Sequence, residues 1–180
     1  MHTRLMVAVL AVALASACAD SVQTPITPGT LSAPVHVTAQ AVGQTHNLET
    51  HLAGRTEVPA NNSLAQGQAI FRLSEDGTEL HYKLIVANIL NVTQAHIHLG
   101  PPDGTGGIVV WLYPSAPPAM LIPGRSQGTL AEGTITASQL VGALLGDTLD
   151  DLMDEIRDNN AYVNVHTSQF PPGEIRGQIR

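Results

Sequence analysis

Three histidines in two short segments are the side chains of this sequence best suited to metal or acid–base chemistry. His96 and His98 stand in the segment AHIHLG at residues 95–100, and His166 stands in YVNVHT at residues 162–167. Both segments alternate apolar and polar residues as strands do, and successive side chains of a strand point to opposite faces. His96 and His98 therefore share one face. If the two strands are neighbours, His166 joins them there.

The chemistry that this pattern predicts is metal binding. A His-x-His pair on one strand face places the two Cα atoms about 7 Å apart, so both rings can reach one ion. A third imidazole from a neighbouring strand would complete a trigonal or open tetrahedral set, which suits copper or zinc. We therefore predict a metal site at His96, His98 and His166 and assign no catalytic residue. His51 and His81 are weaker candidates for a fourth ligand. The alternative is that the three histidines bind loop backbone and brace the fold.

Other polar and aromatic residues leave similar alternatives open. Glu174 and Arg176 share the polar face of the last expected strand, where they would either support the histidines or pair with Glu57 or Arg72. Trp111 and Tyr113 fit core packing better than a carbohydrate platform. The acidic residues at 150–155 fit a solvated helix face better than a calcium loop, because they lack the EF-hand spacing.

Composition limits the classes of protein to consider. The chain has 180 residues, enough for one domain with a sizeable core. It has 8 Lys and Arg against 15 Asp and Glu and carries a formal charge of -7. It shows no basic stripe, so we predict no nucleic-acid partner. Only 13% of residues are charged, and the 16 Gly and 12 Pro favour a β protein rich in loops.

The N-terminus has the pattern of an export signal. Arg4 precedes an apolar run at residues 5–14, and small residues follow at 15–17. The run is shorter than the roughly 20 residues that span a bilayer. We therefore predict a signal peptide at residues 1–17. Cys18, the only cysteine, follows directly, and LASAC at residues 14–18 resembles the lipobox of bacterial lipoproteins.

The lipobox resemblance implies that Cys18 is acylated and becomes the mature N-terminus. Ala15 stands where a leucine is usual, so ordinary cleavage that leaves a free cysteine is the alternative. The protein is then exported and anchored at the bacterial cell envelope, in the periplasm or at the outer membrane, with outer-membrane lipid as its partner through Cys18. Without lipidation it would be secreted. Residues 18–44 have the composition of a flexible tether, and the folded domain is expected at residues 45–180.

The residue pattern of the rest of the chain predicts short strands separated by turns. The expected strands lie at residues 49–55, 66–73, 80–86, 94–99, 108–113, 127–135, 162–167 and 173–180. Two short helices are expected at 137–145 and 149–156, each opened by a capping box. A loop rich in Gly and Pro at 100–107 leaves directly from the histidine strand and would overhang the histidines. This pattern predicts an all-β antiparallel sandwich with a short two-helix insertion before the last strands.

Several motifs together resemble one known family. They are LAGxxEVP at residues 52–59, DGxxLxY at 76–82, AHIHxG at 95–100, YVNVHT at 162–167 and PGEIRGQI at 172–179. In this order they resemble the CHRD domain, the module named after chordin. The resemblance implies a Greek-key sandwich of immunoglobulin-like or Cu/Zn superoxide-dismutase-like type. In animal chordin such domains belong to a secreted antagonist that binds bone morphogenetic proteins, a role that we do not transfer to a bacterial lipoprotein.

These patterns favour a non-enzymatic binding module anchored at the cell envelope that holds copper or zinc through the three histidines. Its other partner would be a protein or a glycan at the envelope. Two alternatives stay open: a redox enzyme of the Cu/Zn superoxide-dismutase type, and a structural or adhesive envelope protein. Redox-active copper with an open coordination position would favour the enzyme. Metal in a closed coordination sphere, or no metal, would favour the binding module or the structural or adhesive protein.

Overall fold

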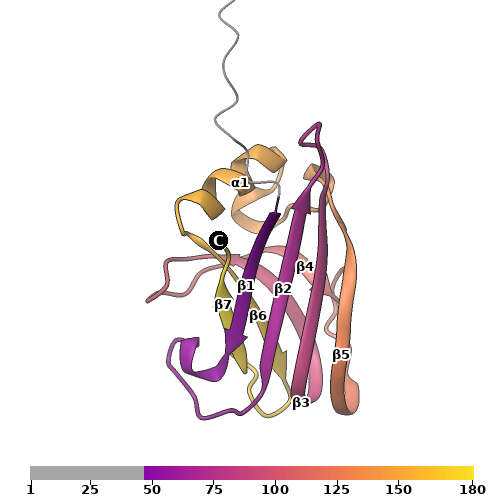
Figure 1. Ribbon diagram of the computed structural model, residues 1–180, viewed down its shortest axis with the longest axis vertical. Helices are drawn as coiled ribbons and strands as arrows, with labels where there is room; N and C mark the ends of the chain where they lie inside the picture. The colour runs from indigo at the N-terminus through magenta and orange to yellow at the C-terminus, as the bar shows by residue number, and fades with distance from the viewer. Residues whose placement is uncertain (1–46) are drawn as a thin grey trace, which may run out of the picture. The chain divides into compact units, whose positions relative to one another are not determined.

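A computed structural model describes residues 47–180 of the chain (Figure 1). The predicted signal peptide, Cys18 and the tether lie outside the described residues and stay predictions. No helix among the described residues is long and apolar enough to cross a membrane. The regular elements are β1 (Asn47–Ala53), β2 (Gln66–Leu73), β3 (Leu80–Leu99), β4 (Ile108–Tyr113), β5 (Ile122–Ile135), α1 (Leu149–Arg157), β6 (Ala161–Thr167) and β7 (Ile175–Gln178).

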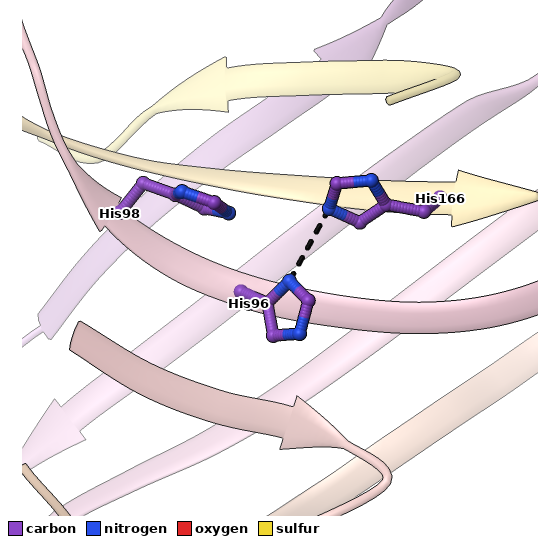
Figure 2. A group of neighbouring side chains, drawn as sticks. All are labelled: His96, His98 and His166. Atoms are coloured by element: carbon purple, nitrogen blue, oxygen red, sulfur yellow. Dashed lines mark hydrogen bonds between the residues drawn. The ribbon is translucent and has the colours of Figure 1, made fainter. Parts of the chain in front are cut away.

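The strands of the described domain form one antiparallel sheet that closes on itself. The order is β2-β1-β7-β6-β3-β4, while β5 also pairs with β3 and β2 pairs with β3. The first half of β3 lies between β2 and β5, and its second half lies between β6 and β4. The second half carries His96 and His98 beside His166 on β6 (Figure 2). The result is a barrel-like sandwich, which confirms the all-β prediction.

β3 is a single strand of 20 residues, whereas the sequence indicated two strands at 80–86 and 94–99. Asn88 and Asn91 adopt positive φ angles of 57° and 53°. Asparagine tolerates this left-handed conformation better than most residues, and the pairing with β5 shifts register at the same place. The strand therefore bends without ending, and this bend lets it pair with different neighbours along its length.

The prediction of a helix at residues 137–145 is wrong. Its capping box between Thr136 and Gln139 is present, but the segment forms only two 3-10 turns, Ala137–Gln139 and Gly142–Leu144. The backbone N–H of Val141 donates to the carbonyl of Val109 on β4 at 2.9 Å, and this bond draws the chain against the strand. A hydrogen bond to a distant strand thus overrides local helix propensity.

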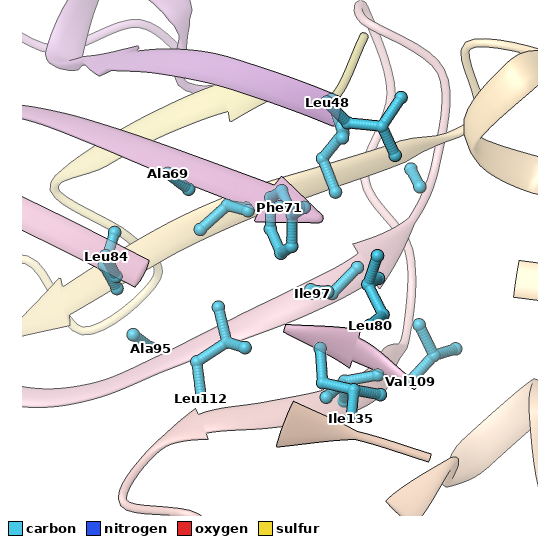
Figure 3. Close-up of a cluster of buried hydrophobic side chains, with 14 of the residues drawn as sticks. Leu48, Ala69, Phe71, Leu80, Leu84, Ala95, Ile97, Val109, Leu112 and Ile135 are labelled. Atoms are coloured by element: carbon cyan, nitrogen blue, oxygen red, sulfur yellow. The ribbon is translucent and has the colours of Figure 1, made fainter. Parts of the chain in front are cut away.

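The second helix, α1, is confirmed, so the insertion contains one α-helix. Thr148 caps it through its hydroxyl and Asp151. Its buried residues are the four apolar residues that recur at helical spacing, namely Leu149, Leu152, Met153 and Ile156. They belong to the main core together with side chains from every strand, among them Phe71, Leu80 and Ile97 in Figure 3.

β6 is buried at all seven positions. One of its faces contributes Val163 and Val165 to the core. The other face, which carries Tyr162, Asn164 and His166, is also shielded from solvent. The polar face that the sequence indicated is therefore a second, polar interior rather than an open surface, and it is here that the histidines lie.

Candidate metal centre

The pairing of β3 with β6 brings the three histidines together. In the antiparallel register His98 lies opposite Tyr162, His96 opposite Asn164, and Gln94 opposite His166. Opposed residues of an antiparallel pair share a face, so all three imidazoles lie on the same side of the sheet. The adjacency that the sequence could only assume is confirmed, and Figure 2 shows the three rings converging.

The three rings form a compact, buried cluster. The ring centroid of His96 lies 5.4 Å from that of His98 and 5.1 Å from that of His166, and the centroids of His98 and His166 are 6.1 Å apart. One ligand atom from each residue lies within 4.8 Å of the others. The side chains are only 0%, 8% and 6% exposed for His96, His98 and His166. A single ion could be held among them.

Backbone carbonyls determine which ring nitrogens keep a lone pair. His98 Nδ1 lies 2.9 Å from the carbonyl oxygen of Gly106, and His166 Nδ1 lies 2.8 Å from that of Pro171. A carbonyl only accepts hydrogen bonds, so each Nδ1 carries the proton and each Nε2 keeps its lone pair. This outer-shell arrangement is the one that orients metal-binding histidines.

His96 completes the network from the opposite side. Its Nδ1 lies 3.2 Å from His166 Nε2, and because that Nε2 has no proton, His96 Nδ1 is the donor. Nε2 of His96 and Nε2 of His98 are buried and have no hydrogen-bond partner among the described residues. Two basic nitrogens in this interior are therefore left without a partner.

Burial keeps the imidazoles neutral. It lowers the pKa of His96 from 6.5 to about 3, and repulsion from His166 and His98 in their charged forms adds to the effect. The pKa of His98 and that of His166 are also lowered, again mainly by burial, although their hydrogen bonds to backbone carbonyls oppose the shift. A metal binds the neutral form of imidazole, so the cluster holds its ligands in the required protonation state.

Two aromatic rings position the histidines. Trp111 on β4 lies opposite His96 in the strand register, and its ring meets the imidazole edge-on at 4.3 Å and 85°. Tyr162 stacks on His98 at 5.0 Å with the planes 8° apart. Sequence reasoning did not place either ring beside the histidines, although Tyr162 shares a strand face with His166. The structure assigns Trp111 to packing within this cluster.

The loop at residues 100–107 contacts the cluster at His98, the histidine from which the sequence predicted that it would leave. Gly106 accepts from His98, and its N–H donates to the hydroxyl of Tyr162 at 3.3 Å. Arg176 holds the same loop by donating to the carbonyls of Gly104 at 2.7 Å and Pro101 at 2.8 Å. A Cβ atom at Gly106 would lie 1.5 Å from the carbonyl oxygen of Leu99, so only glycine fits there.

Comparison with known proteins places these features in a family. The model of the CHRD domain matches residues 48–179, a range that contains all three histidines and nearly all of the described residues. The chain belongs to the CHRD domain family. Searches among curated proteins and among solved structures gave no significant match. Family membership indicates a binding module, and the histidine cluster is the feature of this CHRD domain that could hold a metal.

The other polar residues near the centre of the CHRD domain have structural contacts. Glu174 accepts hydrogen bonds from the hydroxyls of Ser63 at 2.6 Å and Thr167 at 2.7 Å. The guanidinium of Arg176 lies 3.4 Å from the centre of the Tyr162 ring. Among the described residues, neither Glu174 nor Arg176 forms a direct ion pair, so the pairing with Glu57 or Arg72 that the sequence left open is not observed.

Neither proposed fourth ligand joins the cluster of the CHRD domain. His81 lies on the first half of β3, where its Nδ1 is 2.9 Å from the hydroxyl of Thr134 and its Nε2 is 3.5 Å from Glu79. His51 is exposed on β1. Within residues 47–180, His96, His98 and His166 are the one group of three or more metal-binding side chains.

Proposed function

We propose that this CHRD-domain protein is an exported binding module of the bacterial cell envelope that holds one copper or zinc ion through His96, His98 and His166. The observation that carries the proposal is the convergence of three buried, neutral imidazoles, two of which have their lone pairs oriented by backbone carbonyls. The envelope location rests on the N-terminal sequence and its cysteine, Cys18.

The unpartnered nitrogens favour a metal over a structural brace. A brace would use its ring nitrogens in hydrogen bonds, yet Nε2 of His96 and Nε2 of His98 are buried without a partner. Each such buried polar atom costs about 1–3 kcal/mol of stability. A bound ion would recover that cost at His98. If His96 binds through Nδ1, its proton moves to Nε2, as either tautomer of imidazole allows.

The burial of the cluster favours ion storage or structural binding over turnover. A dismutase needs a coordination position that small reactants reach from solvent. Here no ligand is more than 8% exposed, and the loop at 100–107 lies over His98. These features support a binding module, while superoxide-dismutase activity is the enzymatic alternative. A structural or adhesive envelope protein is the alternative without metal.

The metal site is tested by elemental analysis of the full chain, purified without a polyhistidine tag and carrying Cys18→Ser so that the thiol binds nothing. The stripped protein is loaded with copper or zinc and desalted. We expect about one ion per chain, retained in a control with His51→Gln and His81→Gln and lost in a variant with glutamine at the three cluster positions. Circular dichroism verifies that each variant is folded. A parent chain without metal, or a triple variant that keeps it, would refute the site.

The proposed anchor is tested separately in a bacterial host fed with labelled palmitate. We expect label in the parent chain and none in a Cys18→Ala variant, because only an acylated cysteine carries the fatty acid. Cell fractionation then places the parent with the envelope membranes. An unlabelled parent chain found in the medium would instead support the secreted form.

A further inference from the structure

Resting on the proposed metal site, we infer that the ion it selects is monovalent copper, Cu(I), rather than zinc or Cu(II). The inference depends on two features of the interior around the histidines. One is a set of three neutral nitrogen ligands without an anionic ligand, and the other is a fixed positive charge behind one of these ligands. Both features weigh against a divalent ion.

The ligand set itself favours Cu(I). Among the described residues the metal-binding group consists of His96, His98 and His166 alone, so no carboxylate or thiolate joins it. The rings of Trp111 and Tyr162 pack against the imidazoles, and the neutral side chain of Asn164 lies beside His98. Zn(II) almost always takes four ligands. Zn(II) would therefore need a fourth ligand such as water, whereas Cu(I) accepts a coordination number of two or three, and three imidazoles are the set that this interior offers.

The fixed charge is that of Arg176. Its guanidinium carbon lies 3.4 Å from the centre of the Tyr162 ring, while His98 stacks on the same ring at 5.0 Å and 8°. Two planar groups this close to one ring would overlap on a single face, so they occupy opposite faces. Arg176 therefore lies behind His98, separated from it by one aromatic ring, and its hydrogen bonds to Gly104 and Pro101 fix it there.

The nearby carboxylates do not remove this charge from the site. Glu174 is engaged by the hydroxyls of Ser63 and Thr167. Glu57 attracts Arg176, but burial raises the pKa of Glu57 to about 7, so it is only partly ionised near neutral pH. The charge of Arg176 is therefore only partly offset, and it lies one aromatic ring away from His98.

The charge of the ion determines how much its burial and the repulsion by Arg176 lower its binding affinity. The cost of moving an ion from water into an interior of low dielectric constant rises with the square of its charge, so it is about four times larger for a divalent ion. Repulsion by Arg176 rises in direct proportion to the charge. At an effective dielectric constant of about 20, a unit charge two stacking distances away, about 8 Å, lowers a monovalent affinity roughly thirtyfold and a divalent affinity roughly a thousandfold.

Competition with coloured chelators tests the inference. The full chain with Cys18→Ser is titrated without oxygen, against a chelator specific for Cu(I), and in parallel against chelators for zinc and Cu(II). We expect the parent to bind Cu(I) at least about thirtyfold more tightly than zinc, the ratio of the two repulsion factors. Arg176→Gln removes the charge and keeps one donor for the loop carbonyls. It should raise the logarithm of the zinc affinity about twice as much as that of the Cu(I) affinity.

Two further variants separate charge from structure. Arg176→Lys keeps the charge and should leave the ratio of the two affinities unchanged. Arg72→Gln removes an exposed charge on β2, which pairs with the other half of β3, and should change neither affinity. If Arg176 acted only by supporting the loop, its loss would weaken both ions equally, which would overturn the role that we assign to its charge.

The outcomes distinguish this inference from the function on which it rests. A parent that binds zinc or Cu(II) as tightly as Cu(I) overturns the inference and leaves the metal site in place. A parent that binds none of the three ions refutes the metal site itself. If Arg176→Gln does not fold, the affinity ratio in the parent and in Arg176→Lys still decides between Cu(I) and zinc.

Discussion

The acid sensitivity of the metal-free protein tests whether His96 is buried as a neutral ring. Burial first, and repulsion by His166 and His98 second, lower its pKa from 6.5 to about 3. In the unfolded chain the ring titrates near 6.5, so between pH 6.5 and 3 the unfolded state binds a proton that the folded state does not. The free energy of unfolding therefore falls as the pH falls through this range. At pH 5 the loss due to His96 amounts to about 2 kcal/mol.

The assay compares urea unfolding of the chelator-treated full chain at pH 7.5 and pH 5.0 with that of a His96→Gln variant. The comparison is needed because Glu57 acts in the opposite direction. Burial raises its pKa from 4.5 to about 7 against the attraction of Arg176, so its contribution to stability is lost as the pH rises through that range. We expect the parent to lose about 2 kcal/mol more than His96→Gln on going from pH 7.5 to pH 5.0.

The matched control is His81→Gln, which removes an exposed histidine from the other half of the same strand. It should retain the pH dependence of the parent. If His96→Gln also retains it to within about 0.5 kcal/mol, His96 is not held as a neutral ring, and the assignment of lone pairs in the cluster fails with it. A larger dependence in the variant than in the parent would contradict the sign of the argument.

Three further predictions follow from the same contacts. Replacing Glu57 with Gln should abolish the loss of stability between pH 4.5 and 7, a gain of about 3 kcal/mol at pH 8 that urea unfolding would measure; a parent-like pH dependence would contradict it. Gly106→Ala should lower the free energy of unfolding by about 3 kcal/mol or more, because its Cβ would lie 1.5 Å from the Leu99 carbonyl oxygen, whereas Gly107→Ala, with no atom within 4 Å, should be tolerated. Copper or zinc at about 100 times its dissociation constant should raise Tm by roughly 10 °C in thermal unfolding, and should leave the triple glutamine variant unchanged.

The sequence was sufficient for the features that depend on local patterns. The alternation in AHIHLG and YVNVHT assigned the three histidines to strand faces, and the Gly- and Pro-rich residues at 100–107 indicated the loop above them. The spacing of apolar residues after Thr148 identified α1. In each case the residues that determine the structure lie within a few positions of one another, so their periodicity is visible in the chain itself.

Features that depend on contacts between segments far apart in the chain could not be predicted from the sequence. The sequence indicated a break between residues 86 and 94, but pairing with β5 continues across Asn88 and Asn91. The helix expected at 137–145 is replaced by turns because Val141 bonds to β4. The stack of Arg176, Tyr162 and His98 joins three strands. No local signal could reveal it, because each residue taken alone also fits an ordinary strand.

The arrangement of the histidines depends both on local contacts and on pairing between distant strands. Each of His98 and His166 donates to a carbonyl in the loop that directly follows its own strand, at Gly106 and Pro171. The lone pairs are thus oriented by short-range contacts, while the long-range pairing of β3 with β6 sets the distance between the rings. Both conditions are met before any ion arrives, so binding would require little reordering of side chains. Because ordering a flexible side chain costs about 0.5–1.5 kcal/mol, a preorganised cluster retains more of the free energy of coordination as affinity.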